Sequence, residues 1–208
     1  MRSAPRPRAA PDAAPADRPD GDPRLHVCVV CSGNICRSPI GEQVLRQAIA
    51  DAGLDDQVRV SSAGTGDWHI GQGANRRAVK VLRAAGYATD HTARQITPRD
   101  LAGVDLALAA DRGHLEDLRR MTPDHTKIAL LRSFDPAADD DEVPDPYYGP
   151  DSGFDEVLAM TEAAVPGVVE EIRRLLRDRR VADRAGAPAG STPESRARAG
   201  VTQAGSGR

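Results

Sequence analysis

The chain alternates between short apolar runs and segments whose apolar residues recur at helical spacing. Short apolar runs bounded by turn-forming residues are typical of buried strands, whereas apolar residues three and four positions apart predict helices that bury one face. We expect strands over residues 25–30, 57–62, 104–109 and 128–131. We expect helices over residues 40–49, 74–85 and 112–120, with a short helical turn over 97–101. Strands that alternate with helices predict a parallel sheet with right-handed crossover connections.

A long helix is predicted to close the folded part of the chain. Apolar residues recur at helical spacing from Phe154 to Leu176. Pro166 and Gly167 lie inside this pattern. Proline lacks a backbone N–H and crowds the preceding turn, so we expect the helix to be kinked or split at this pair.

Both ends of the chain lack such patterning. Residues 1–23 are mostly Ala, Pro, Arg and Asp, and residues 181–208 are mostly Ala, Gly, Ser, Arg and Pro. Segments of this composition do not bury enough apolar surface to offset the entropy lost on ordering. We therefore expect a disordered N-terminal extension over 1–23, a single domain over 24–180 and a disordered C-terminal tail over 181–208.

The overall charge and the cysteine count exclude several classes of protein. A net charge of −3 over 208 residues leaves no basic footprint for nucleic acid. No apolar run approaches the ~20 residues of a membrane span, and the N-terminus has no apolar segment of a secretory signal. Three cysteines form no disulfide framework and favour a reducing compartment. We expect a cytoplasmic protein, while secretion without a signal peptide stays open.

The strongest chemical signal directly follows the first predicted strand, in the stretch Cys31-Ser32-Gly33-Asn34-Ile35-Cys36-Arg37-Ser38-Pro39. A loop between a strand and a helix start turns successive backbone N–H groups toward one space, and the helix adds partial positive charge there. Such a nest binds a phosphate-sized anion and favours the thiolate form of Cys31. Arg37 offers a planar fork of donors to a tetrahedral oxyanion. The loop thus holds a nucleophile and an anion site together.

A nucleotide-binding loop is the other common phosphate cradle. It needs Gly-Lys-Ser/Thr at its end, whereas this loop ends in Arg37 and Ser38 and holds no lysine. The chemistry therefore points to the cysteine. Cys28, three residues earlier within the strand, is expected to fill the core.

The motif Cys-x-Gly-Asn-x-Cys-Arg-Ser-Pro resembles the phosphate-binding loop of the low-molecular-weight protein tyrosine phosphatases of bacterial type, and the resemblance extends from Leu25 to Arg180. It implies one doubly wound α/β domain whose four-stranded parallel sheet has the order 2-1-3-4. Helices are expected on both faces, with the phosphate-binding loop after strand 1.

The same resemblance implies metal-independent hydrolysis of phosphotyrosine through a phosphocysteine intermediate on Cys31. The partner implied is a tyrosine-phosphorylated protein substrate. No cluster of side chains has the spacing of metal ligands, and we expect no cofactor, no nucleic acid, no membrane and a monomer.

A second catalytic segment is expected at Asp145-Pro146-Tyr147-Tyr148, inside a long proline- and aspartate-rich stretch. Asp-Pro pairs are also ordinary turn chemistry. All four residues, however, match the general-acid segment of the resembled family. The resemblance therefore implies that Asp145 is the general acid and that both tyrosines border the cleft.

The glycine-rich loop after the second strand carries Trp68, the only tryptophan, and His69. Ligands bind at the carboxyl ends of strands in open α/β sheets, so this loop is expected beside Cys31. Trp68 is expected to form an aromatic wall against the substrate ring, with His69 also touching the substrate. A related branch acting on phosphoarginine has threonine where this chain has Ile35, so Ile35 favours phosphotyrosine. The full set expected to bind substrate is Ser32, Gly33, Asn34, Ile35, Cys36, Ser38, Trp68, His69, Tyr147 and Tyr148.

Further residues are expected to support the loop. By the resemblance, Ser62 and His91 tie down Asn34, and Ser38 joins this network. Its physical role is to hold Asn34 in a left-handed conformation, which Asn tolerates better than most residues. We also expect Ser38 to donate a hydrogen bond to the Cys31 sulfur. Asp111, which follows the third strand, is expected to cap the next helix and to lie near the site floor.

Three hypotheses remain at this stage. The resemblance implies that Cys36 pairs with Cys31 as a reversible disulfide, against the alternative of a small buried thiol. An arsenate reductase of the same fold is a rival activity, but it relays a disulfide through downstream cysteines and this chain has none after Cys36. A non-catalytic phosphotyrosine-binding module is the second rival. It would need neither a nucleophile nor an acid, so the presence of both Cys31 and Asp145 argues against it.

Overall fold

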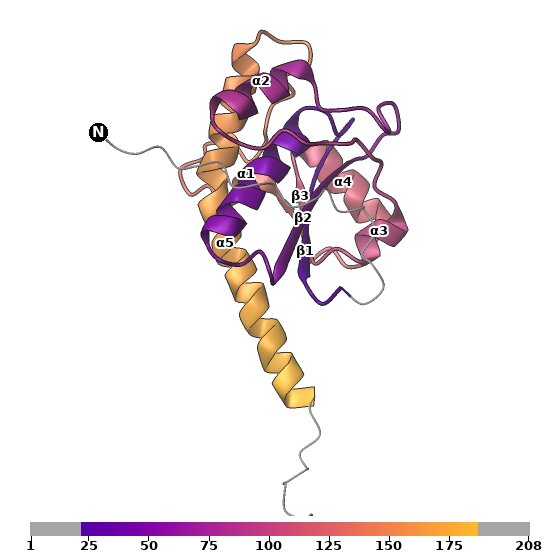
Figure 1. The fold of residues 1–208 in the computed structure, drawn as a ribbon. Coiled ribbons are helices and arrows are strands. Elements are labelled where there is room, and N and C mark those ends of the chain that lie inside the picture. Colours follow the sequence, from indigo (N-terminus) through magenta and orange to yellow (C-terminus); the bar gives the residue numbers. More distant parts are fainter. Residues whose placement is uncertain (1–21, 187–208) are drawn as a thin grey trace, which may run out of the picture.

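The computed structural model describes residues 22–186 (Figure 1). Its strands are β1 (Leu25–Cys31), β2 (Val58–Gly64), β3 (Leu106–Ala109) and β4 (Ile128–Leu130). Its helices are α1 (Arg37–Asp51), α2 (Arg76–Ala84), α3 (Pro98–Ala102), α4 (Arg112–Met121) and α5 (Ser152–Gly186), with a 3-10 turn η1 (Leu131–Phe134). The alternation of strands and helices predicted from the apolar pattern is confirmed, with bounds shifted by a few residues.

The four strands form one parallel sheet in the order β2-β1-β3-β4, as predicted. Val29 in β1 lies opposite Ser62 of β2 and Leu108 of β3. The chain therefore leaves β1 toward one side of the sheet and later returns to its other side. The carboxyl end of β1 lies at this switch point, where loops from both sides diverge and leave room for a ligand.

Alternate residues of β1 point to two separate cores. Val27 and Val29 pack with α1 and α5, whereas Cys28 and Val30 pack with residues of α3 and α4. Figure 1 shows α1, α2 and α5 on one side of the sheet, with α3 and α4 on the other. Because both faces are covered, β1 is buried along its whole length, as its continuous apolar run predicts. The buried Cys28 confirms its predicted place in the core.

Helix α1 packs directly on the strand that precedes it. A Cβ added at Gly41 would lie only 2.8 Å from Cγ1 of Val29. Glycine at this position therefore allows the helix to approach the sheet closely. The close packing fixes the start of α1, and with it the loop that joins β1 to α1.

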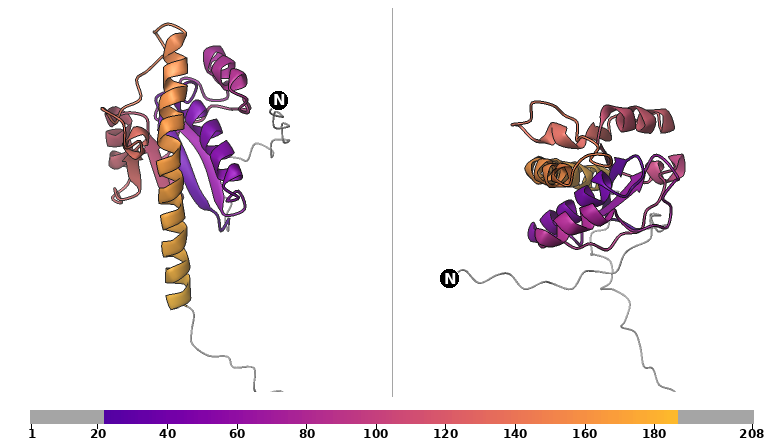
Figure 2. Two further views of the ribbon diagram at one scale, coloured as in Figure 1. Left: turned by 90° about the vertical axis from the view of Figure 1, so that its left-hand side faces the viewer. Right: turned by 90° about the horizontal axis from the view of Figure 1, so that it is seen from above.

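The closing helix α5 is continuous from Ser152 to Gly186, so the predicted split at Pro166 is wrong. In the left view of Figure 2, α5 runs in one line past the end of the sheet. A Cβ at Gly167 would lie 2.2 Å from the carbonyl oxygen of Phe134. Gly167 thus allows a tight contact between α5 and η1, and the helix continues through Pro166.

The described residues extend a few positions beyond each boundary of the predicted domain. Asp22, placed in the N-terminal extension by the sequence, forms an ion pair with Arg24 at 2.9 Å and approaches Arg59 at 3.8 Å. At the other end, α5 continues six residues beyond 180, although the apolar pattern of the sequence stops near that residue. The predictions for 1–21 and 187–208 lie outside the described residues. Within residues 22–186, no helix is long and apolar enough to cross a bilayer.

Candidate active site

The loop after β1 wraps around a small space between Cys31, the last residue of β1, and Arg37, the first residue of α1. Its backbone is held from the side by β2. Thr65 N donates to the carbonyl of Cys31 and Gly66 N donates to that of Ser32, both at 2.9 Å. A Cβ at Gly64 would lie 2.6 Å from the Ser32 carbonyl oxygen, so glycine is required at this point of contact. The carboxyl end of the neighbouring strand thus fixes the loop.

Asn34 turns the loop with a left-handed backbone, at φ 55°, as predicted. Its side-chain amide donates to the hydroxyls of Ser38 at 2.9 Å and Ser62 at 2.8 Å, and its amide oxygen accepts from Arg94 N at 2.9 Å. His91 Nε2 donates to the Asn34 carbonyl at 2.6 Å. These contacts place Ser62, His91, Asn34 and Ser38 in one network, and they offset the conformational cost of the left-handed residue.

Glu42 completes this network, and the sequence did not indicate it. Ser62 donates to Glu42 at 2.5 Å, and His91 Nδ1 lies 3.6 Å from the same carboxylate. Burial would raise the pKa of Glu42, but the hydrogen bond from His91, the Arg46 cation at 2.6 Å and Ser62 outweigh it and hold the pKa below its usual value. The network is therefore anchored on a buried carboxylate.

The donors and acceptors of the network orient the Ser38 hydroxyl. The Asn34 amide group only donates, so Ser38 accepts from it and keeps its own proton for another partner. Cys31 Sγ lies 2.9 Å from Ser38 Oγ. The distance allows the predicted hydrogen bond between Ser38 and the sulfur, and the free hydroxyl proton makes Ser38 the donor.

Arg37 is buried beneath the loop, with 4% of its surface exposed. Nη1 donates to Asp111 Oδ2 at 2.7 Å and to the Val143 carbonyl at 3.1 Å. Nη2 donates to Asp145 Oδ2 at 2.9 Å and to Ser32 Oγ at 3.3 Å. One planar guanidinium thus links the phosphate loop, the floor of the site and the predicted general acid.

Asp111 lies at the floor of the site, as predicted, and caps α4 by accepting from His114 N at 2.9 Å. Its Oδ1 also lies 2.7 Å from His114 Nδ1, while His114 Nε2 contacts Ser32 Oγ at 2.8 Å. Burial would raise the pKa of Asp111, but the hydrogen bonds from His114 and Arg37 outweigh it and hold the pKa well below its usual range. Asp111 is therefore a carboxylate that fixes Arg37.

The sequence missed His114, although one local signal was available. A polar residue three positions after a helix-capping aspartate faces back toward that cap. The pair Asp111 and His114 has this spacing. Because His114 is buried against Ser32, it ties the start of α4 to the phosphate loop.

Asp145 lies on the irregular segment before α5, at the mouth of the site. Its Oδ1 accepts from Tyr147 N at 3.0 Å, and its Oδ2 faces Arg37. The rings of Tyr147 and Tyr148 meet edge to face, with centroids 4.8 Å apart. Tyr148 is 96% exposed and Trp68 is 68% exposed, so both present aromatic surface to an incoming ligand.

A cleft of about 340 Å³ opens above the loop. The side chains around it include Cys31, Arg37 and Asp145, and eight of the expected substrate-binding positions line it: Ser32, Gly33, Ile35, Cys36, Trp68, His69, Tyr147 and Tyr148. Asn34 and Ser38 do not line the cleft, contrary to expectation. Both are fully buried behind the loop, where they hold its backbone and the sulfur.

Two thiols lie in this loop, and their surroundings differ. Burial, the charge of Cys31 and the charge of Asp145 together raise the pKa of Cys36 to about 12. Cys36 is therefore a neutral thiol at pH 7. The hydroxyl of Ser38 contacts the sulfur of Cys31, so the structure favours Cys31 as the nucleophile.

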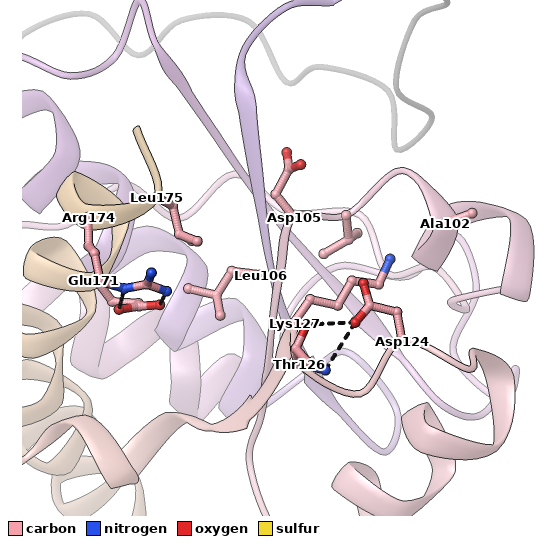
Figure 3. Close-up of a pocket in the computed structure, with 10 residues that line it drawn as sticks. Ala102, Asp105, Leu106, Asp124, Thr126, Lys127, Glu171, Arg174 and Leu175 are labelled. Atoms are coloured by element: carbon pink, nitrogen blue, oxygen red, sulfur yellow. Dashed lines mark hydrogen bonds and ion pairs between the residues drawn. The ribbon is translucent and has the colours of Figure 1, made fainter. Parts of the chain in front are cut away.

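Another hollow, of about 360 Å³, lies at the amino ends of β3 and β4, away from the phosphate loop. Figure 3 shows Glu171 and Arg174 side by side on α5, where they pair across 2.5 Å. Lys127 donates to the Leu101 carbonyl at 2.6 Å. No cysteine or histidine lines this hollow. Within residues 22–186, no group of three or more His, Cys, Asp and Glu side chains could hold a metal ion.

Comparisons with known proteins agree with this geometry. The family model described as "Low molecular weight phosphotyrosine protein phosphatase" matches residues 26–178. The "Low molecular weight protein-tyrosine-phosphatase" of Streptomyces coelicolor is 49% identical over 158 residues, which cover 74% of this chain and 96% of that protein. The "Low molecular weight protein-tyrosine phosphatase A" of Mycobacterium tuberculosis is 49% identical over 157 residues, with the same coverage of 74% and 96%.

A solved structure shows the same fold. The crystal structure of a protein tyrosine phosphatase from Entamoeba histolytica, with Hepes in the active site, superposes with a TM-score of 0.70. It is 33% identical, and the match covers 72% of this chain and 97% of that one.

Proposed function

This chain belongs to the low molecular weight phosphotyrosine protein phosphatase family, and we propose that it hydrolyses phosphotyrosine in proteins through a phosphocysteine intermediate. One observation carries the proposal. The Cys31 thiol, the Arg37 guanidinium and the Asp145 carboxyl group line one cleft, and Arg37 donates both to Asp145 and to Ser32, the residue after Cys31. A nucleophile, an anion site and an acid in one cleft are what transfer of a phosphoryl group to a cysteine requires.

In the first step, the Cys31 thiolate attacks the phosphorus in line with the ester oxygen. An S–P bond forms and the P–O bond to the tyrosine breaks. Asp145 gives its proton to the departing phenolate oxygen, so tyrosine leaves as a neutral phenol. The hydroxyl of Ser38, 2.9 Å from the sulfur, stabilises the thiolate before attack.

In the second step, a water molecule attacks the phosphocysteine and gives a proton to the Asp145 carboxylate. The S–P bond breaks, inorganic phosphate forms and the thiolate returns. Dividing the hydrolysis into two transfers lowers the barrier of each. The loop N–H groups and the buried Arg37 stabilise the charge on the equatorial oxygens throughout.

The walls of the cleft support phosphotyrosine as the substrate. Trp68 and Tyr148 present exposed aromatic surface. The ring of Tyr147 packs against that of Tyr148, and its backbone N–H donates to Asp145. A slot with these walls lets a long aryl phosphate reach Cys31, whereas phosphoserine falls short. Ile35 adds an apolar side chain to the lining, which suits an aromatic ring better than a guanidinium.

Two rivals are weaker. An arsenate reductase that relays a disulfide needs cysteines after the loop, and the chain has only Cys28, Cys31 and Cys36. A phosphotyrosine reader does not need Asp145 beside the anion site. We further propose that the protein is a cytoplasmic monomer that acts on a phosphoprotein and binds no membrane. We also propose that it binds no nucleic acid, because the net charge of −3 leaves no basic footprint.

The test is hydrolysis of a phosphotyrosine peptide with chelator and reductant present. We expect turnover by the wild type, none by Cys31→Ser and a loss of about 100-fold or more in Asp145→Ala. Asp139→Ala, on the same acidic stretch and 91% exposed, is the matched control and should keep full activity. A wild type that binds the peptide without turnover would make it a reader. No turnover and no binding would point to another oxyanion, with arsenate as the next candidate.

A further inference from the structure

Arg77 joins the first turn of α2 to the segment that carries Asp145. Its Nη2 donates to the Tyr147 carbonyl at 2.5 Å, and its Nη1 donates to the Gly149 carbonyl at 2.8 Å. The first of these carbonyls lies two residues after Asp145. One guanidinium therefore holds two points of the acid segment, which has no regular secondary structure of its own.

The guanidinium of Arg77 is itself fixed in place. Its central carbon lies 4.5 Å from the ring centroid of Phe154, in the first turn of α5. Phe154 is fully buried, so the ring cannot move away. Stacking on this ring sets the plane of the guanidinium and therefore the direction of both hydrogen bonds.

The base of Arg77 is tied to the phosphate loop. Asn75 N donates to the Ile35 carbonyl at 2.7 Å, and the Asn75 side chain caps α2 by accepting from Arg77 N at 2.9 Å. A continuous path thus runs from the loop of the nucleophile, through Asn75 and Arg77, to the segment of the acid. Helix α2 sets the distance between the two.

Such a link is needed because, in the proposed mechanism, the ion pair between Arg37 and Asp145 breaks when substrate binds. In the structure, Asp145 is held by Arg37 Nη2 at 2.9 Å. A phosphate in the cleft takes that donor, and Asp145 must then face the leaving oxygen instead. The two bonds from Arg77 go to backbone carbonyls and do not compete with phosphate.

The neighbouring ion pair cannot do this. Lys80 and Asp151 meet at 3.1 Å, but their side chains are 72% and 62% exposed. Surface pairs of this kind contribute little to structure. From these contacts we propose that Arg77 is a positioning residue for the general acid, an inference that rests on the proposed function.

The inference predicts a dependence on the leaving group. A phenolate leaves poorly without a proton, whereas 2,4-dinitrophenolate leaves without one. Displacing the acid segment therefore slows phenyl phosphate and spares 2,4-dinitrophenyl phosphate. A defect in the phosphate loop or in the fold slows both substrates equally.

The experiment compares Arg77→Met, Arg77→Lys and the matched control Arg76→Met, a neighbouring exposed arginine of the same helix. In Arg77→Met we expect kcat/KM for phenyl phosphate to fall about tenfold or more, and that for 2,4-dinitrophenyl phosphate to change less than about twofold. Inhibition by vanadate should stay within about twofold, since the anion site is intact. Arg77→Lys should lose less, and Arg76→Met should match the wild type.

A double variant tests whether Arg77 acts through Asp145. Adding Arg77→Met to Asp145→Ala should cause no further loss with phenyl phosphate, because the acid is already absent. Equal losses on both substrates, or a further loss in the Asp145→Ala background, would overturn the inference. If Arg77→Met melts well below the wild type, Arg77→Lys carries the same comparison of substrates.

The inference and the proposed function fail in different ways. Wild-type turnover that needs Cys31, together with an unaffected Arg77→Met, overturns the inference alone. No turnover by the wild type overturns the proposed function and the inference with it.

Discussion

Arg37 donates to Asp145 across 2.9 Å, so the cation that we propose binds phosphate also holds the carboxyl group that we propose protonates the leaving oxygen. The same guanidinium is fixed from below by Asp111 at 2.7 Å. Of the two carboxylates, Asp111 is the permanent partner, because its pKa is held well below its usual range by His114 and Arg37 against the effect of burial. Asp145, half exposed at the cleft mouth, is the partner that we expect a substrate to displace.

Replacing Asp145 with Asn should therefore strengthen the binding of inorganic phosphate while it slows turnover. The change removes a negative group that competes for Arg37 and repels the anion. We expect the inhibition constant for phosphate to fall about threefold to tenfold, as for the loss of a partly screened charge contact. Asp139→Asn, whose carboxylate pairs with Arg132 away from the cleft, should leave the constant unchanged. Weaker phosphate binding in Asp145→Asn would contradict the competition.

The left-handed turn of the loop predicts a graded loss of stability at Asn34. Asn34→Gly keeps the backbone conformation and loses three side-chain hydrogen bonds, two of them buried, at about 1 kcal/mol each. Asn34→Ala loses the same bonds and adds about 1 kcal/mol for a left-handed residue with a Cβ. Urea unfolding should rank wild type above Asn34→Gly and Asn34→Ala last. Equal stability of the two variants would mean that the backbone strain contributes nothing.

Glu42 is expected to account for part of the loss of folding stability at low pH. Its folded-state pKa is lowered, so the unfolded chain takes up its proton first as the pH falls. The stability that it contributes is complete above its ordinary pKa of 4.5 and is lost as the pH falls through the lower folded value. Glu42→Gln should be about 1–3 kcal/mol less stable at pH 7. The difference from wild type, measured by urea unfolding from pH 7 to pH 3, should shrink below pH 4.5. A difference independent of pH would contradict the assignment.

The sequence predicted the parts of the site that lie close together in the chain. Cys31 and Arg37 bound one loop between a strand and a helix, and the family resemblance placed Asp145 beside them. The apolar pattern predicted the sheet because the central strands β1 and β3 are buried along their whole length. These features depend on local spacing or on strand order, both of which are visible in a sequence.

Glu42 and Arg77 were not predicted, because Ser62, Tyr147 and Phe154, which define their roles, lie far away in the chain. Glu42 looks like an ordinary surface residue of an amphipathic helix until β2 brings Ser62 to it. Arg77 gains meaning only when α5 places Phe154 beneath its guanidinium. Pro166 misled in the opposite way, because tertiary contacts of α5 outweighed its local effect on the helix.

Trp68 is expected to act on substrate binding and not on stability. Its indole ring lies over Gly66 and remains mostly exposed at the rim of the cleft. Trp68→Ala should raise KM for a phosphotyrosine peptide about threefold to tenfold, equivalent to an aromatic contact of roughly 0.5–1.5 kcal/mol. The melting temperature should stay close to that of the wild type. Ile70→Ala, exposed on the same loop but outside the cleft lining, is the control, and an equal rise in KM there would argue against a wall at Trp68.

Cys36 is expected to protect the nucleophile from peroxide. Peroxide oxidises the Cys31 thiolate to a sulfenic acid and is itself reduced to water. The thiolate charge of Cys31 is one cause of the raised pKa of Cys36, after burial, and this charge disappears on oxidation. Cys36 then ionises more readily, and its sulfur attacks the sulfenic sulfur, forms a disulfide and expels hydroxide.

The comparison that tests this protection is activity recovered on adding a thiol reductant after peroxide, in Cys36→Ser and in the wild type. We expect full recovery in the wild type, because a disulfide is reducible. In Cys36→Ser the sulfenic acid persists and is oxidised further to the irreversible sulfinic acid, so recovery should fall with exposure time. Cys28→Ser, whose thiol lies on the opposite face of β1, should recover like the wild type. Equal recovery in Cys36→Ser would leave Cys36 as a small buried thiol that only packs the loop.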